Sequence, residues 1–133
     1  MAAPNLLNAT SIVGMSTVLV ATASTQNILT CPANKLIKIT SMFCTNSHTG
    51  AENLDVRLNK NGLHCERSFF GMSDDHGGTS NNATFPASRT QVYPAGWYME
   101  ENDVLQVVCG SGSLMSFNGA VTVCVSYDLI DDA

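Results

Sequence analysis

Apolar residues recur at every second position along much of this 133-residue chain, and this period constrains the fold more than any other feature. In segment 53–59 (NLDVRLN), Leu54, Val56 and Leu58 alternate with polar residues. Such alternation is typical of a β-strand with one buried face. No stretch of ten residues has the 3.6-residue period of an amphipathic helix. The sequence therefore predicts an all-β fold.

About seven other segments have the same pattern or a β-rich composition: 16–23, 27–31, 35–45, 63–70, 90–93, 103–109 and 120–130. Asn61-Gly62 predicts a hairpin turn, because both residues readily adopt positive φ. About eight short strands separated by turns indicate a single antiparallel β-sandwich or jelly-roll-like domain. The predicted core comprises Ile37, Ile39, Phe43, Leu54, Val56, Leu58, Val121, Val123 and Val125.

The N-terminal segment departs from this pattern. Residues 1–14 (MAAPNLLNATSIVG) show no strong alternation and contain a proline. We expect an extended arm over 1–14, preceding a sandwich domain over 15–133. An arm outside its own sheet would leave apolar side chains uncovered, so four of them are predicted to bind a partner chain: Leu6, Leu7, Ile12 and Val13.

Charge and hydropathy exclude several classes of partner. The net charge is −5 and the six basic residues are dispersed, whereas nucleic-acid binding needs clustered Lys and Arg. No apolar run approaches the roughly 18 residues that span a bilayer. No basic residue precedes Lys35, so a secretory signal is not expected, and we expect synthesis and folding in a cytoplasm. Charged residues make up only 13%, against roughly 25% in typical domains, which favours a homo-oligomer that buries surface against neighbours.

The five cysteines are predicted to be reduced. Their number is odd and no C-x-x-C pair occurs, so neither a disulfide framework nor a zinc site is expected. Cys31 and Cys44, thirteen positions apart, are interpreted as packing residues. If the apolar faces of the last two predicted strands share a core, Cys109 points inward and Cys124 outward. A disulfide between these two would then need a β-bulge.

No catalytic signature is present. The sequence lacks a nucleophile elbow, a zinc-protease motif, a P-loop and a dinucleotide fingerprint. Glu100, Glu101 and Asp103 precede a predicted strand and are interpreted as a turn cap at the surface, not as an acid–base pair. Segment 71–83 is interpreted as a solvated loop without a cation site. We therefore predict no enzyme activity, no cofactor and no metal.

Four segments together resemble a known group of proteins: PNLLNATSIVG, CPANKLIKITSMFCTN, YPAGWYMEENDVLQV and AVTVCVSYDLID. They are similar to motifs of small virion structural proteins of tailed bacteriophages, of the cyanophage and marine myovirus type. The resemblance covers about residues 4–46 and 93–131. This chain departs from the pattern in its longer 71–83 loop and in Asn102, where relatives have glycine. Asparagine also tolerates positive φ, so the second departure should preserve the turn.

The resemblance implies a β-sandwich protein of the virion. The leading hypothesis is a capsid decoration (cement) protein on the capsid surface that bridges subunits of the major capsid protein. Such proteins commonly form trimers, because a local three-fold site suits a three-fold ligand. The alternative is a neck, tail or fibre component with a host-recognition role, in which the 71–83 loop, Trp97 and Tyr98 would contact a receptor.

Overall fold

The computed structural model describes residues 9–22, 24–47, 52–60, 63–65, 83–85, 88–109 and 121–131. Within these ranges the regular elements are all strands, which confirms the all-β prediction. The strands are β1 (Ile12–Val20), β2 (Gln26–Thr30), β3 (Lys35–Asn46), β4 (Glu52–Lys60), β5 (Leu63–Cys65), β6 (Ala83–Phe85), β7 (Arg89–Val92), β8 (Tyr98–Met99), β9 (Val104–Cys109) and β10 (Val121–Asp131).

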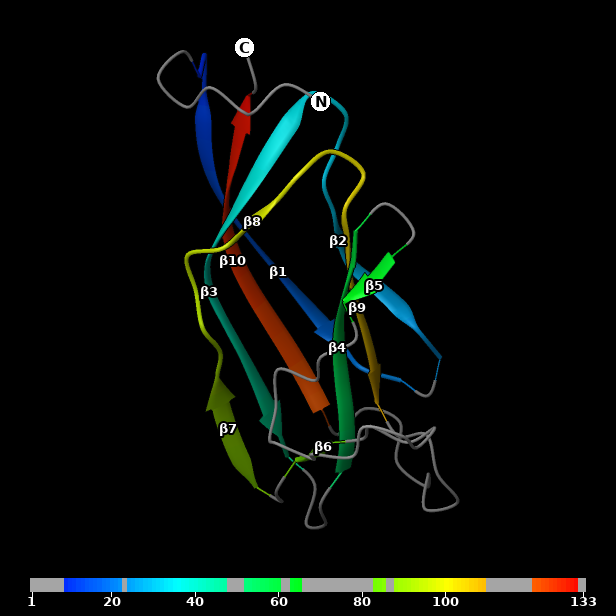
Figure 1. Cartoon of the computed structure of the whole chain (residues 1–133). Coiled ribbons are helices and arrows are strands. Elements are labelled where there is room, and N and C mark those ends of the chain that lie inside the picture. The colour runs from blue at the N-terminus through cyan, green and yellow to red at the C-terminus, as the bar shows by residue number, and fades with distance from the viewer. Residues whose placement is uncertain are drawn as a thin grey trace.

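The strands form two antiparallel sheets, which face each other in Figure 1. In sheet A the order is β1-β10-β3-β7, with β8 also paired to β3. In sheet B the order is β2-β9-β4-β5, with β6 also paired to β4. The two sheets enclose the core, so the predicted antiparallel β-sandwich is confirmed.

The connectivity is that of a long hairpin rolled into two sheets. The first strand pairs with the last, β1 with β10, and the second with the one before it, β2 with β9. Further in, β3 pairs with β7 and β8, and β4 with β5 and β6. This nesting of antiparallel pairs across two sheets is the jelly-roll arrangement. The predicted jelly-roll-like topology is therefore confirmed.

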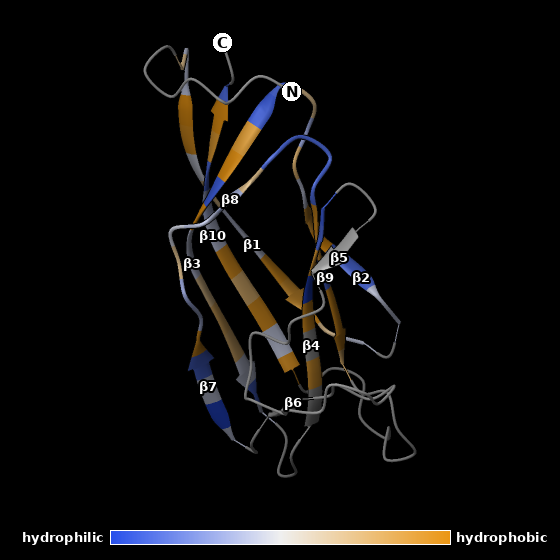
Figure 2. Cartoon of the chain, in the orientation of Figure 1, coloured by the Kyte–Doolittle hydropathy of each residue, from blue (hydrophilic) through white to orange (hydrophobic). Residues whose placement is uncertain are grey.

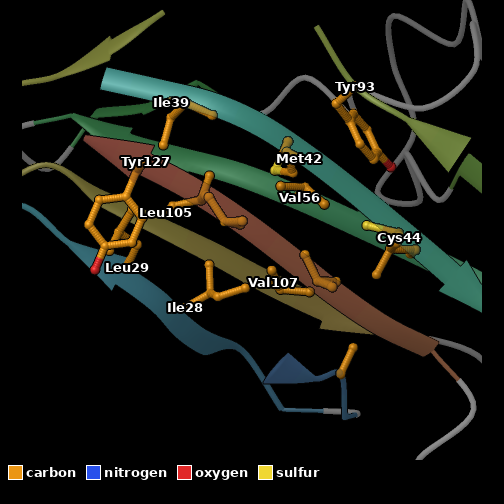
Figure 3. Packing of buried hydrophobic residues seen from close by; sticks show 14 of the residues in the cluster. Ile28, Leu29, Ile39, Met42, Cys44, Val56, Tyr93, Leu105, Val107 and Tyr127 are labelled. Atoms are coloured by element: carbon orange, nitrogen blue, oxygen red, sulfur yellow. The ribbon is translucent and has the colours of Figure 1, made fainter. Parts of the chain in front are cut away.

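Alternating side chains fill the space between the sheets. The inward residues of β4, β9 and β10 are almost fully buried, as Figure 3 shows for Val56, Leu105 and Val107. Seven of the nine predicted core residues have 1% or less of their surface exposed: Ile37, Ile39, Leu54, Val56, Val121, Val123 and Val125. Leu58 is partly buried and packs against this cluster. The remaining residue, Phe43, is 38% exposed, and its assignment to the core is wrong.

A β-bulge in β3 explains the error. Thr40 has no partner in β10, because Ile39 pairs with Tyr127 and Ser41 pairs with Ser126. One extra residue in a strand moves every later side chain to the opposite face. The bulge therefore changes which positions of β3 point into the core.

The change of face is visible in the burial along β3. Before the bulge Ile37 and Ile39 are buried, whereas after it Met42 and Cys44 are buried, both 0% exposed. Phe43 keeps the odd-numbered position of the first half and so points out of the sandwich. The prediction assumed that one alternation ran through the whole strand.

The predicted arm is also corrected. Ile12, Val13 and Gly14 belong to β1 and pair with Ile130, Leu129 and Asp128 of β10. The boundary at residue 14 is therefore wrong, because the sheet of the domain begins at Ile12. Leu6 and Leu7 lie outside the described residues.

The start of β1 is tied to the end of β10. The Ser11 hydroxyl hydrogen-bonds with the Asp131 carboxylate, and the Asp131 backbone N–H donates to the Ser11 carbonyl at 3.1 Å. Thr10 Oγ1 donates to the same carboxylate at 3.4 Å, and Lys35 forms an ion pair with it. These contacts hold the segment before β1 against sheet A.

The hairpin predicted at Asn61-Gly62 is consistent with the strand register. Lys60 of β4 pairs with Leu63 of β5, so two residues connect the strands. A turn also precedes β3, with Asn34 at φ 58° immediately before the strand.

Candidate interaction surface on sheet A

Four apolar side chains form a row across the outer face of sheet A. Directly paired residues of adjacent strands point to the same face. Val18 pairs with Cys124, Cys124 with Phe43, and Phe43 with Val92. Val92 is 74% exposed and Val18 62%. We call Val18, Cys124, Phe43 and Val92 the apolar row.

Uncharged residues lie on both sides of the apolar row. On one side, register places Ser16, Ser126 and Ser41 next to one another. On the other side, Val20, Thr122, Thr45 and Thr90 form a parallel row, and the hydroxyls of Thr45 and Thr90 lie 3.0 Å apart. This part of sheet A therefore presents an apolar strip between two strips of mostly hydroxyl-bearing side chains, without a charged group.

Strand β1 extends this surface to the edge of sheet A. Five of its apolar residues are exposed: Ile12, Val18 and Val20 on the outer face, and Val13 and Met15 on the inner face near the edge. Figure 2 shows apolar colouring at both ends of β1, whereas β7 at the opposite edge is hydrophilic over most of its length. Ile12 and Val13, predicted to bind a partner, lie here with 63% and 52% of their surface exposed. Their role as partner-binding residues stays a prediction.

A polar cluster at the turn between β8 and β9 has a structural role. Asp103 is fully buried, and its Oδ2 accepts hydrogen bonds from the Glu100 backbone N–H at 2.8 Å and from Lys60 Nζ at 3.3 Å. Lys60 also pairs with Glu100 Oε2 at 3.3 Å. Asn102 adopts φ 67°, as expected for an asparagine in place of glycine. The predicted turn cap is confirmed, but its central carboxylate is buried and does not lie at the surface.

The charges of this cluster stabilise the protonated form of Lys60. Burial lowers the pKa of Lys60, but the hydrogen bond and negative charge of Asp103, followed by those of Glu100, outweigh it and raise the pKa overall. The ammonium group thus remains charged and linked to Asp103. This geometry connects β4 to the β8–β9 turn.

Burial differs among the cysteines. Cys31, Cys44 and Cys109 are buried, whereas Cys124 is partly exposed. The opposite orientations predicted for Cys109 and Cys124 are confirmed, as is the absence of a bond between them. The side chain of Cys65 lies outside the described residues. Figure 3 shows Cys44 and Tyr93 among the core residues between the two sheets.

Burial suppresses ionisation of two of these thiols. Desolvation, followed by the charge of Asp103, raises the pKa of Cys31 to about 11. Desolvation raises the pKa of Cys44 to about 12, although the Tyr93 hydroxyl acts in the opposite direction. Because the thiolate is the reactive form, neither thiol suits nucleophilic chemistry.

Native-state alkylation should therefore distinguish the thiols. With iodoacetamide at pH 8 and peptide mass spectrometry, we expect Cys124 to be labelled much faster than Cys31, Cys44 and Cys109. In denaturant the four should react at similar rates. Rapid labelling of Cys44 in the folded protein would contradict its placement in the core.

Stability should also fall at alkaline pH. An unfolded cysteine ionises near pH 8.5, whereas Cys31 and Cys44 remain protonated in the folded state until about pH 11 and about pH 12. Between about pH 8.5 and these higher pKa values the unfolded state binds fewer protons than the folded state, so the free energy of unfolding decreases as pH rises. Urea unfolding from pH 7 to pH 10 should show this decrease. Cys44→Ala should lower the stability at pH 7 but show a shallower decrease, and an unchanged slope would contradict the assignment.

The described residues show neither a metal centre nor a membrane-spanning helix. Among them, no three His, Cys, Asp or Glu side chains are grouped to hold a metal ion. The same residues contain no helix long and apolar enough to cross a membrane.

Comparison with known proteins gives little further information. No protein family matches the sequence, and no curated protein does. Among solved structures, a structure of the infectious bursal disease virus Gt strain is similar over 92% of this chain, with 10% sequence identity and a TM-score of 0.36. The similarity spans 31% of that chain's length. A similarity of this size carries no argument about the role of the chain.

Proposed function

We propose that this chain is a structural protein of a tailed-phage virion, which decorates the capsid and bridges its subunits. The uncharged part of the outer face of sheet A, formed by the apolar row and the rows on either side of it, carries the proposal. An exposed apolar strip across several strands is typical of a surface that binds another protein. Here the strip includes Val18, Phe43 and Val92, all of which are exposed.

The surface suits a contact with a subunit of low charge. The apolar row would supply buried area, and hydroxyls of the neighbouring rows, such as those of Thr45 and Thr90, would supply hydrogen bonds at its border. We infer that the major capsid protein or another virion subunit covers this face. The jelly roll occurs in capsid proteins but also in lectins and cupins, so the fold alone does not select this function.

The proposal names a tailed phage because of the short sequence motifs. Their similarity to small virion proteins of tailed phages covers both termini of the sandwich, including β1, β3, β9 and β10. The proposal includes synthesis in the host cytoplasm, a location on the capsid surface, and no catalytic activity, cofactor or nucleic-acid partner. The host-recognition alternative has no comparable support. Its loop over 71–83 lies almost wholly outside the described residues, and the Trp97 indole N–H is already bonded to the Pro94 carbonyl at 3.1 Å.

Virion composition tests the proposal. In purified particles of the phage that encodes the chain, quantitative mass spectrometry should find it in a copy number comparable with the major capsid protein. A few copies per particle would indicate a neck or tail role. Absence from the particles would overturn the virion proposal.

A pair of charge variants tests the surface. Val92→Lys places a charge on the apolar row, and Thr30→Lys places the same charge on an exposed position of β2 in sheet B. When the gene is replaced by each variant, Val92→Lys should lower occupancy on the particles, and Thr30→Lys should not. Both proteins should keep the circular dichroism spectrum of the wild type. Full occupancy with Val92→Lys would show that the outer face of sheet A is not the contact.

A further inference from the structure

Strand β1 differs from every other sheet edge in the described part of the chain. It is nine residues long, has an unbroken register with β10, and contains no charged residue and no proline. Natural sheet edges are normally protected by shortness, charge, proline or bulges, because a free edge pairs readily with another chain. The absence of all four from β1 is therefore informative.

The remaining edges show these protections. On the other side of sheet A, β7 has four residues and carries Arg89, and β8 has two residues. In sheet B, β2 has five residues and a register shift against β9, while β5 and β6 have three residues each. Among the described edges, only β1 offers a long and regular template for strand addition.

The backbone of β1 directs a defined set of groups to the open side. The Ser11 carbonyl accepts from Asp131 N–H, and the Ala21 N–H donates to the Val121 carbonyl, so odd-numbered residues bond to β10. In an antiparallel ladder, alternate residues of a strand direct both backbone groups to opposite sides. The even-numbered residues therefore direct their N–H and C=O groups to the open edge: Ile12, Gly14, Ser16, Val18 and Val20.

We propose that β1 of a second copy of this chain pairs antiparallel with this edge, about a two-fold axis at Ser16. Ser16 is the central residue of β1, so this register overlaps all nine residues. Ile12 then pairs with Val20 of the second copy, Gly14 with Val18, and Ser16 with Ser16. Each of the five even-numbered positions forms a hydrogen-bonded pair with two bonds, which gives ten bonds between the chains. The two five-stranded sheets A become one continuous sheet.

Self-pairing fits the side chains as well as the backbone. Because β1 carries no charge, the pairing brings no like charges together. On the inner face, Val13 would lie opposite Leu19 of the second copy, and Met15 opposite Thr17. Val13 and Met15 are 52% and 44% exposed in the single chain, so the pairing covers apolar surface that the domain itself leaves open. Another edge of the second copy would be a poorer partner, because each is short.

The inference goes beyond the proposed function and does not depend on it. The two-fold arrangement is isologous, with each β1 serving as both partner surfaces, and it closes at two subunits. It therefore predicts a dimer, in contrast to the trimer expected from the resemblance. A dimer in solution is compatible with any location of the chain.

Charge variants at the axis test both the assembly and its register. Analytical ultracentrifugation of the full chain should give a dimer that dissociates on dilution. Ser16→Lys should give a monomer, because two lysines would lie directly opposite each other. Ser16→Glu should give a monomer for the same reason, and an equimolar mixture of the two variants should restore the dimer. Val92→Lys introduces the same charge at the opposite edge of sheet A and should leave the dimer intact.

Each outcome decides the proposal. A wild-type monomer at all concentrations, or a trimer, overturns it. A dimer that persists in Ser16→Lys, or a mixture that stays monomeric, overturns the register centred on Ser16. Hydrogen exchange gives a backbone test that needs no variant, since amides of Gly14, Ser16 and Val18 should become protected as the protein concentration rises. Protection that is independent of concentration would count against a second copy.

Discussion

Replacing Ile39 with alanine is expected to destabilise the protein by about 2–5 kcal/mol, the usual cost of removing a large aliphatic side chain from a core. Ile39 is 0% exposed and points between the two sheets. Urea unfolding followed by circular dichroism measures the loss as a lower midpoint at an unchanged slope.

Phe43→Ala is the matched control, because sequence periodicity places both residues in the core whereas the structure separates them. Phe43 is 38% exposed on the outer face, so its truncation should cost about 1 kcal/mol or less. Midpoints should be compared at one protein concentration, because dissociation of a dimer contributes to the unfolding free energy. If the two variants were equally destabilised, the bulge and the resulting change of face would be wrong.

Loss of the buried carboxylate should have the second largest effect. Asp103→Ala removes the acceptor of the Glu100 backbone N–H and of Lys60 Nζ. A buried donor left without a partner costs about 1–3 kcal/mol, and because both donors here are only part-buried the loss should lie toward the lower end, with the missing side-chain volume added to it. We therefore expect a lower urea midpoint, together with faster hydrogen exchange in the turn over 100–103.

Glu100→Gln provides the control for this prediction. It removes the ion pair with Lys60 but keeps the backbone N–H and Asp103 in place. Both side chains of that pair are 38% exposed, and exposed pairs contribute about 0–1 kcal/mol. Asp103→Ala should therefore be clearly the more destabilising change. Equal effects would mean that the surface ion pair, and not the buried carboxylate, stabilises the turn.

Strands with one buried face could be predicted from the sequence. In β4 and β10, alternation identified inward residues such as Leu54, Val56 and Val123, each of which is 0% exposed. The first half of β1 could not be found in this way. Residues 12–16 are exposed whichever face they lie on, because β1 is at the edge of the sheet, so burial imposes no period on them. The position of β1 at the edge of the sheet removes the periodic pattern and also leaves its apolar residues exposed.

The bulge and the candidate surface depend on information that periodicity does not contain. A bulge adds one residue, and Thr40 has no feature that marks it as the extra one. The apolar row joins Val18, Phe43, Val92 and Cys124 from four strands, and only the register between those strands makes them neighbours. Asp103 was recognised as part of a turn, but its hydrogen-bond partner Lys60 is 43 positions away in the chain, which the local sequence does not indicate.

The rolled-hairpin topology also determines when the protein can fold. Ser11 and Asp131 lie 120 positions apart in the sequence and yet are bonded to each other. Contacts between distant segments slow folding, because a long loop must close before they form. During synthesis β1 leaves the ribosome long before β10, its described partner strand. In that interval β1, which carries no charge, has both edges open because β10 has not yet been made. Correct assembly thus competes with pairing between nascent chains, so the yield of folded protein should depend on how slowly it is expressed and on access to chaperones.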